Sequence, residues 1–141
     1  MKTGFRYSLA VVLTLTASTA LAQDTLGALL GGGAKRVEQD LAQAVAGTKM
    51  NGPSPSGQAD MVAVELREGG VASGQFFNKQ YGQTGSVYGK WNVEKGKVCF
   101  LVRGRLLTED GCFNVYRLGD KLYRAVVDSE DPATPVVEMP R

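Results

Sequence analysis

Two cysteines, Cys99 and Cys112, are the side chains in this sequence with the widest range of chemistry. Such a pair can form a structural disulfide, act as a redox couple or bind a metal ion. Redox couples usually take the form Cys-x-x-Cys at the start of a helix, whereas these cysteines lie in consecutive β-type runs joined by one loop. A zinc site needs four ligands, and the sequence contains no histidine. The pattern predicts a structural disulfide that closes a hairpin, with a redox-active pair as the alternative.

Other catalytic and cofactor-binding patterns find little support in the sequence. The lack of histidine excludes Ser-His-Asp and Cys-His catalysis. The adjacent acids Glu109-Asp110 and Glu130-Asp131 are typical of solvated turns and tails rather than of a catalytic cleft. The run Gly31-Gly32-Gly33 precedes a predicted helix and is a weak candidate for an anion site, but a flexible hinge is the favoured interpretation. We therefore predict a protein that is not an enzyme and that uses no cofactor and no metal.

Exposed aromatic and arginine side chains are the candidate partner-binding residues. Trp91 lies on the apolar face of its predicted strand and is predicted to be a core anchor, with ligand stacking as the alternative. Tyr88 lies on the opposite face, and Tyr81 lies in a long polar loop, as side chains of binding surfaces often do. Arg103 and Arg105 lie in the predicted loop 103–111, which joins the two strands of the disulfide hairpin. The competing interpretation is that the tyrosines line a barrel wall and that the arginines keep a sheet edge soluble.

Short runs with alternating apolar residues, separated by glycine-containing turns, must position these side chains. The alternation predicts six strands and allows a seventh near 48–51. The six predicted strands are 61–67, 71–77, 86–93, 97–102, 112–118 and 121–127. Strands at this spacing with no helix between them pair antiparallel, and a sheet this large in a small domain tends to curl. The prediction is a mainly β fold, either a small antiparallel barrel or a strongly bent six- to seven-stranded sheet, with a flat two-sheet sandwich as the alternative.

Composition divides the rest of the chain into a leader, one helix and a tail. Residues 23–33 are small and glycine-rich, which favours a flexible leader. Apolar residues recur at helical spacing in 34–47, and Gly47 fits the end of a helix. Three prolines and several acids in 128–141 favour an extended tail. The predicted organisation is therefore a leader at 23–33, a helix plus β-domain at 34–127 and a tail at 128–141.

The first 22 residues have the pattern of a cleavable signal peptide. Lys2 and Arg6 precede an apolar run at 9–15, and Ala20-Leu21-Ala22 fits the small-x-small cleavage rule. A transmembrane anchor is the alternative, but the run is shorter than the roughly 20 residues that span a bilayer. Cleavage would leave Gln23 first and would lower the 16 basic residues to 14, equal to the 14 acids. We therefore expect a periplasmic protein that binds no nucleic acid and does not insert into the membrane once mature.

The glycine, tryptophan and cysteine spacing of the second half resembles a family of small exported alphaproteobacterial proteins whose function is largely unassigned. The resemblance covers 34–127 and implies the predicted fold more than any activity. The residues that match its pattern are Gly47, Gly89, Trp91, Val93, Gly96, Val98, Cys99, Phe100, Cys112, Val115, Tyr116, Arg117, Gly119, Asp120 and Tyr123. The chain is also similar in plan to periplasmic inhibitors of proteases and lysozymes, which are small disulfide-pinned barrels. No inhibitory loop motif of those proteins occurs here, and similarity of architecture alone says little about function.

These observations favour a non-catalytic periplasmic interaction module. It would bind another exported protein, or the periplasmic part of a membrane protein, and would modulate it as an inhibitor or an accessory factor. The alternative is a carrier that holds a small apolar ligand inside a calycin-like barrel. The number of large residues predicted to point inward favours a filled interior and places this alternative second. Those residues are Val62, Leu66, Phe76, Trp91 and Phe100.

Overall fold

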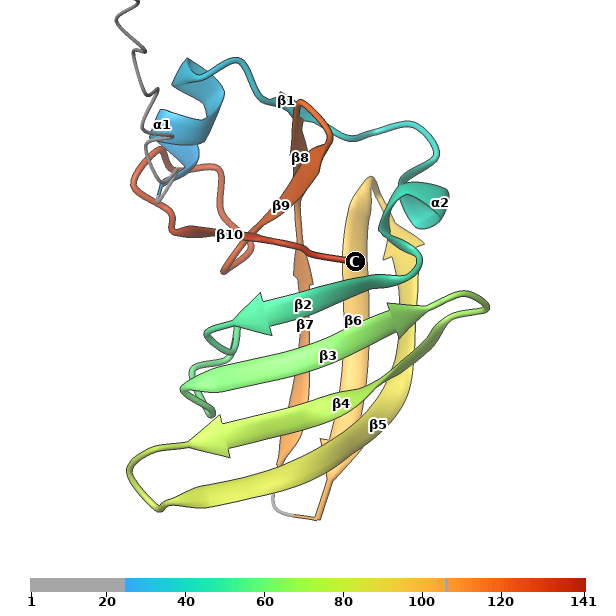
Figure 1. Ribbon diagram of the computed structural model, residues 1–141, viewed down its shortest axis with the longest axis vertical. Coiled ribbons are helices and arrows are strands. Elements are labelled where there is room, and N and C mark those ends of the chain that lie inside the picture. The colour runs from blue at the N-terminus through green and yellow to red at the C-terminus, as the bar shows by residue number, and fades with distance from the viewer. Residues whose placement is uncertain (1–24, 106) are drawn as a thin grey trace, which may run out of the picture.

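The computed structural model describes residues 25–105 and 107–141, so the predicted signal peptide and its cleavage site lie outside the described residues. The described chain forms two short helices, α1 (Leu26–Gly31) and α2 (Leu41–Val45), and ten strands. The strands are β1 (Lys35–Arg36), β2 (Thr48–Gly52), β3 (Met61–Arg67), β4 (Val71–Asn78), β5 (Gln83–Glu94), β6 (Lys97–Gly104), β7 (Thr108–Phe113), β8 (Val115–Leu118), β9 (Lys121–Ala125) and β10 (Val136–Glu138). They form a six-stranded sheet in the order β2-β3-β4-β5-β6-β7 and a four-stranded sheet in the order β1-β8-β9-β10. The smaller sheet and α1 lie at one end of the larger sheet (Figure 1).

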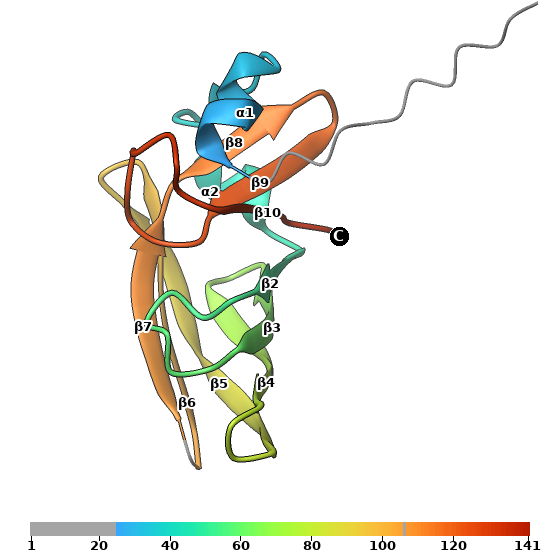
Figure 2. The same ribbon diagram turned by 90° about the vertical axis from the view of Figure 1, so that its left-hand side faces the viewer.

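The larger sheet is an antiparallel meander in which every strand pairs with its neighbours in the sequence. In β3, Val62, Val64 and Leu66 are buried, while the residues between them are exposed or half-buried. This alternation is what allows one face of the sheet to cover a core while the other contacts water. The sheet curls strongly into a half-barrel, as Figure 2 shows from the side. The predicted fold class, a strongly bent antiparallel sheet, is confirmed.

Two glycines on the concave face allow the sheet to bend. A Cβ on Gly74 would lie 1.9 Å from the carbonyl oxygen of Ala63, and one on Gly89 would lie 1.9 Å from that of Leu101. Both glycines are on inner strands, β4 and β5, where the neighbouring backbone comes too close for any side chain. Glycine at such positions is the usual means of curving a sheet toward closure.

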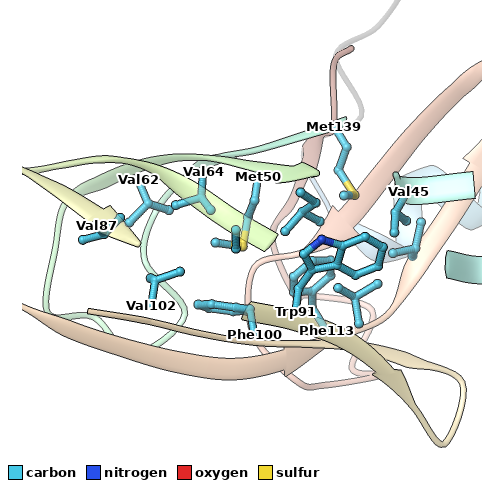
Figure 3. Packing of buried hydrophobic residues seen from close by; sticks show 14 of the residues in the cluster. Val45, Met50, Val62, Val64, Val87, Trp91, Phe100, Val102, Phe113 and Met139 are labelled. Carbon is cyan, nitrogen blue, oxygen red and sulfur yellow. The ribbon is translucent and has the colours of Figure 1, made fainter. Parts of the chain in front are cut away.

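Large apolar side chains fill the concave side of the half-barrel. Figure 3 shows Met50, Val62 and Val64 on one wall pointing toward Phe100 and Val102 on the other. All five are at most 4% exposed. Trp91 lies in the same cluster, 7% exposed, and its indole Nε1 donates a hydrogen bond to the carbonyl oxygen of Arg67 at 2.7 Å. The indole therefore both fills the core and connects β5 to the end of β3.

The segment expected to be a flexible leader is ordered from Thr25 onward. The side-chain oxygen of Thr25 accepts a hydrogen bond from the Ala28 amide and caps α1. Leu26 and Leu29 are at most 1% exposed and pack against the smaller sheet, next to Tyr116. Burial raises the pKa of the Tyr116 hydroxyl above its ordinary value. Two leucines three positions apart lie on one face of a helix, and burial of that face stabilises α1 despite the glycines that follow.

The predicted helix at 34–47 is shorter than expected. Only Leu41–Val45 is helical, and Lys35–Arg36 instead forms β1, which pairs with β8. The Val37 amide also donates to the carbonyl oxygen of Val115, so the free edge of β8 binds this segment. Asp40 has a positive φ of 52°, which interrupts any helix between the two parts. Tertiary pairing has overridden the local apolar pattern here.

The last two predicted segments also differ from expectation. The predicted strand 112–118 is divided at Asn114 into β7 and β8, which belong to different sheets. The tail at 128–141 is packed, because β10 pairs with β9 and both Val136 and Met139 are buried. An isolated bridge between Thr25 and Pro135 joins the tail to the start of α1. The proline-rich end is therefore part of the fold.

A buried arginine connects the two sheets. Arg124 of β9 is fully buried, and its Nη2 donates to the carbonyl oxygens of Asn51 at 2.7 Å and Pro53 at 3.0 Å. Its guanidinium lies 5.7 Å from the centre of the Phe113 ring, a cation–π contact. Burial lowers the pKa of Arg124 to about 10, so the group stays cationic at neutral pH.

Candidate functional site

Tyr88 and Arg103 lie directly opposite each other on the outer face of the larger sheet. They are register partners in β5 and β6, so Arg103, which the sequence pattern placed in a loop, lies in a strand beside Tyr88. Tyr88 is 66% exposed and Arg103 is also exposed. The alternation of β5 directs Val87 and Trp91 into the core and leaves Tyr88 on the other side. An exposed ring beside a guanidinium is a common arrangement in protein interfaces.

Lys90 and Leu101 form the next pair on the same face and extend this surface. They are opposed in the β5–β6 register, and Leu101 is 41% exposed. We call these four residues, Tyr88, Lys90, Leu101 and Arg103, the Tyr88 surface. Within the described chain neither Lys90 nor Arg103 forms an ion pair. Both cations are therefore available to a carboxylate on another molecule.

The strands beneath the Tyr88 surface hold it in a fixed shape. β5 has eight register pairs with β4 and eight with β6, and its residues 87–90 pair on both sides. The disulfide between Cys99 and Cys112, with Cα atoms 4.0 Å apart, joins β6 to β7 on the same outer face, two residues from Leu101. The predicted disulfide bond is thus confirmed. A surface built on paired strands loses little conformational freedom when a partner binds.

Tyr81 and Arg105 do not join this surface. Tyr81 is 65% exposed in the turn between β4 and β5, and Arg105 is exposed in the turn between β6 and β7. β6 ends opposite Val87, while β5 extends further to Gln83, so Tyr81 lies beyond the end of β6. The two residues share one end of the sheet but belong to separate turns.

Sequence reasoning missed two parts of the outer face. Leu101 was not selected because its neighbours depend on the β5–β6 register, which the sequence pattern leaves open. Met61 and Phe77 are opposed in β3 and β4 and are 49% and 40% exposed, forming a second apolar spot. Lys90, in contrast, could be assigned from the sequence, because a period-two pattern places it on the same face as Tyr88.

Glu109 is not the solvated turn residue that the sequence predicted. Its side chain is fully buried and points to the concave side of β7. Its carboxylate accepts hydrogen bonds from the Ser56 amide at 2.8 Å and the Ser56 hydroxyl at 2.6 Å. The β2–β3 loop thereby reaches across the open side of the half-barrel to β7. Two hydrogen bonds from one loop residue give Glu109 a structural role.

The space that a ligand carrier would need is occupied. Each of the five residues predicted to point inward is 7% exposed or less. A hollow of about 480 Å³ lies instead at the surface, between α2 and the β3–β4 turn, with Ala42, Ala46 and Trp91 among its lining residues. A second surface hollow, of about 530 Å³, also borders Trp91, with Val71, Phe100 and Leu101 among its lining residues.

Comparison with known proteins gives no further guide to the site, because no family model, curated protein or solved structure is detectably similar to this chain. The resemblance to small exported alphaproteobacterial proteins therefore stays a prediction. Within 25–105 and 107–141, no helix is long and apolar enough to cross a bilayer. Among the same residues, no group of three or more His, Cys, Asp or Glu side chains is arranged to hold a metal ion.

Proposed function

We propose that this protein is a non-catalytic interaction module of the periplasm, which binds another exported protein or the periplasmic part of a membrane protein and modulates it as an inhibitor or an accessory factor. The observation that carries the proposal is the Tyr88 surface. There, an exposed ring, an exposed leucine and two cations that form no ion pair with the described residues lie on one rigid face. The disulfide beside it is suited to an oxidising compartment.

The chemistry of the Tyr88 surface defines the partner surface that would fit it. Leu101 and the Tyr88 ring offer apolar area, while Lys90 and Arg103 lie on either side of it and carry no counter-charge from the described chain. A complementary partner would present an apolar side chain surrounded by carboxylates. Tyrosine and arginine are enriched among the residues that dominate binding energy, so these two side chains are the expected hot spots.

Affinity capture with protein carrying a C-terminal tag, from a periplasmic extract of the organism that makes it, tests the proposal. The measurement compares the wild type with Tyr88→Ser and Arg103→Ser, and uses Arg117→Ser in β8 as a matched control for an exposed arginine. We expect one protein to be retained by the wild type and by Arg117→Ser, and to be reduced at least tenfold by each of the other two variants. Equal retention by all four proteins, or no specific retention, would contradict the proposal.

A second candidate function, carriage of a small apolar ligand, is favoured only by the hollow beside Trp91. Titration with 1-anilinonaphthalene-8-sulfonate while Trp91 emission is recorded distinguishes the two. A module whose indole is packed in the core predicts no saturable change in emission. A saturable change that is abolished by Ala46→Phe, which would fill the hollow without adding a second tryptophan, would instead support a carrier.

A further inference from the structure

The disulfide shows which backbone groups of β7 point away from β6. Directly opposed residues in antiparallel strands alternate between hydrogen-bonded pairs, with Cα atoms about 5.5 Å apart, and non-hydrogen-bonded pairs at about 4.5 Å. The Cα atoms of Cys99 and Cys112 are only 4.0 Å apart, so this is a non-hydrogen-bonded pair. Every second residue of β7, counted from Cys112, is likewise in a non-hydrogen-bonded pair with β6. The N–H and C=O groups of Thr108, Asp110 and Cys112 therefore point outward from the edge of the sheet.

This edge differs from the opposite edge of the same sheet. On β2, the Lys49 amide donates to the Pro140 carbonyl oxygen, and Asn51 accepts from Arg124, so the chain itself covers that edge. On β7, no described residue forms a hydrogen bond with the outward backbone groups of Asp110 or Cys112. The β2–β3 loop bonds only to the Glu109 side chain there, on the concave side. Unpaired edge groups of this kind are a template for another strand.

We propose that the β7 edge, Thr108–Phe113, binds an extended segment of the partner protein as an additional strand of the sheet. The inference rests on the proposed function and specifies how the partner is held. Main-chain hydrogen bonds to Thr108, Asp110 and Cys112 supply the affinity in this mode, and alternate side chains of the bound segment supply the specificity. The seven-stranded sheet so formed would be closer to a closed barrel.

Charge on β7 defines the segment that fits. Asp110 is exposed on the outer face and forms no ion pair with the described residues, and β7 has no basic residue of its own. The residue placed opposite Asp110 is therefore a lysine or arginine, because opposite charges stabilise a cross-strand pair and like charges oppose it. The same rule argues against a second copy of this chain, since a symmetric β7–β7 pair centred on Asp110 would oppose two aspartates.

The edge is continuous with the Tyr88 surface. Thr108 is the register partner of Arg103, and Asp110 is the partner of Leu101, so only β6 separates the edge from Tyr88. A partner that adds a strand to β7 would bring its next residues over the outer face of β5 and β6. One partner can therefore use both features.

Selection from a random dodecapeptide library tests the inference without knowledge of the natural partner. We expect selected peptides to alternate in polarity, to carry Lys or Arg at one position and to slow hydrogen exchange at the Asp110 and Cys112 amides. Asp110→Lys should weaken their binding at least tenfold, while Asp120→Lys in the β8–β9 turn, with the same charge change, should leave it unaltered. Methylation of alternate peptide amides should abolish binding.

Failure of the inference is distinct from failure of the proposed function. Peptides that bind equally well to Asp110→Lys, or that leave the two amides unprotected, overturn strand addition, and so does a library that yields no binder. If Tyr88→Ser still loses the protein captured from the extract in any of these cases, the proposed function stands and only the mode of binding is wrong.

Discussion

At the scale of single residues, burial decides the roles of the polar side chains. Glu109 and Asp110 are adjacent in the sequence, but the alternation of β7 directs one into the concave side and the other into solvent. Glu109 accepts two hydrogen bonds from Ser56, while Asp110 has no described partner. Of these neighbouring acids in one strand, Glu109 therefore holds the fold together, while Asp110 is left free for the binding role that we propose.

Replacing Glu109 with glutamine is expected to destabilise the fold. Glutamine keeps the size of the side chain but carries no charge, so the hydrogen bonds with Ser56 lose their charge assistance and the Ser56 hydroxyl must turn to accept from the new NH2 group. Hydrogen bonds to a charged group contribute about 1.5–3 kcal/mol and neutral ones about 1 kcal/mol, so the expected loss is about 1 kcal/mol. Urea denaturation measures it, with Asp110→Asn as the control, which should change the free energy of unfolding by less than about 0.5 kcal/mol. Equal effects of both substitutions would refute the structural role of Glu109.

At the scale of elements, the curl of the six-stranded sheet depends on close backbone approach. Gly74 and Gly89 lie where neighbouring strands leave no room for a Cβ. The disulfide then joins β6 to the edge strand β7. The glycines thus account for the curvature of the sheet, and the disulfide for the stability of its β7 edge. Separate substitutions can test each.

Gly89→Ala is expected to lower the free energy of unfolding by about 3 kcal/mol or more, because its methyl group would overlap the Leu101 carbonyl. Gly31→Ala is the matched control. Gly31 is the last residue of α1, and a Cβ there meets nothing within 4 Å, so this variant should stay within about 1 kcal/mol of the wild type. Thermal or urea denaturation gives both values. A Gly89→Ala protein of wild-type stability would mean that the sheet is flatter than described.

Removing the disulfide with Cys99→Ser and Cys112→Ser together is expected to cost about 3 kcal/mol, because the cross-link closes a short loop in the unfolded chain. The two positions are 13 residues apart. Capture of the partner at a temperature where the double variant is folded should be retained, since neither cysteine belongs to the Tyr88 surface and the β7 edge binds through the Cys112 main chain, which serine keeps. Loss of capture with unchanged stability would instead support a redox function.

The sequence predicts these elements unequally. Alternation located β3, β4 and β6 to within two residues, because half-buried strands must alternate. The split at Asn114 was not predictable, since residues 112–118 favour a strand throughout and only the change of sheet separates β7 from β8. β1 was not predicted, because it forms by pairing with the edge of β8, which lies far along the chain. Of the candidate site, alternation supplied the face of Tyr88, but only the register placed it opposite Arg103.

At the scale of the whole molecule, side chains and termini join the two sheets. Arg124 donates from β9 to the end of β2 and the following loop. Ion pairs between Arg36 and Glu130, and between Lys97 and Asp128, connect the tail to earlier strands, but they are partly exposed and contribute little. The buried arginine is therefore the main polar connection between the sheets among these contacts.

Arg124→Met is expected to destabilise the protein by about 1–3 kcal/mol, because the carbonyl groups of Asn51 and Pro53 lose their donor while the volume is largely kept. Hydrogen exchange at the β2 amides should accelerate more than exchange in β4. Arg117→Met, an exposed arginine of the same sheet, is the control and should have little effect. Unchanged exchange in β2 would show that apolar packing alone holds the sheets together.

The pairing of the two ends of the described chain has a consequence for the order of folding. The Leu26 amide donates to Thr134, the Gly27 amide donates to Pro132, and Pro140 covers the edge of β2. A chain made from its N-terminal end therefore carries α1 without its partners in the tail, and β2 paired only with β3, until the last ten or so residues have been added. Until then the outer edge of β2 is open to neighbouring molecules, and an uncovered sheet edge is a site at which chains can pair and aggregate.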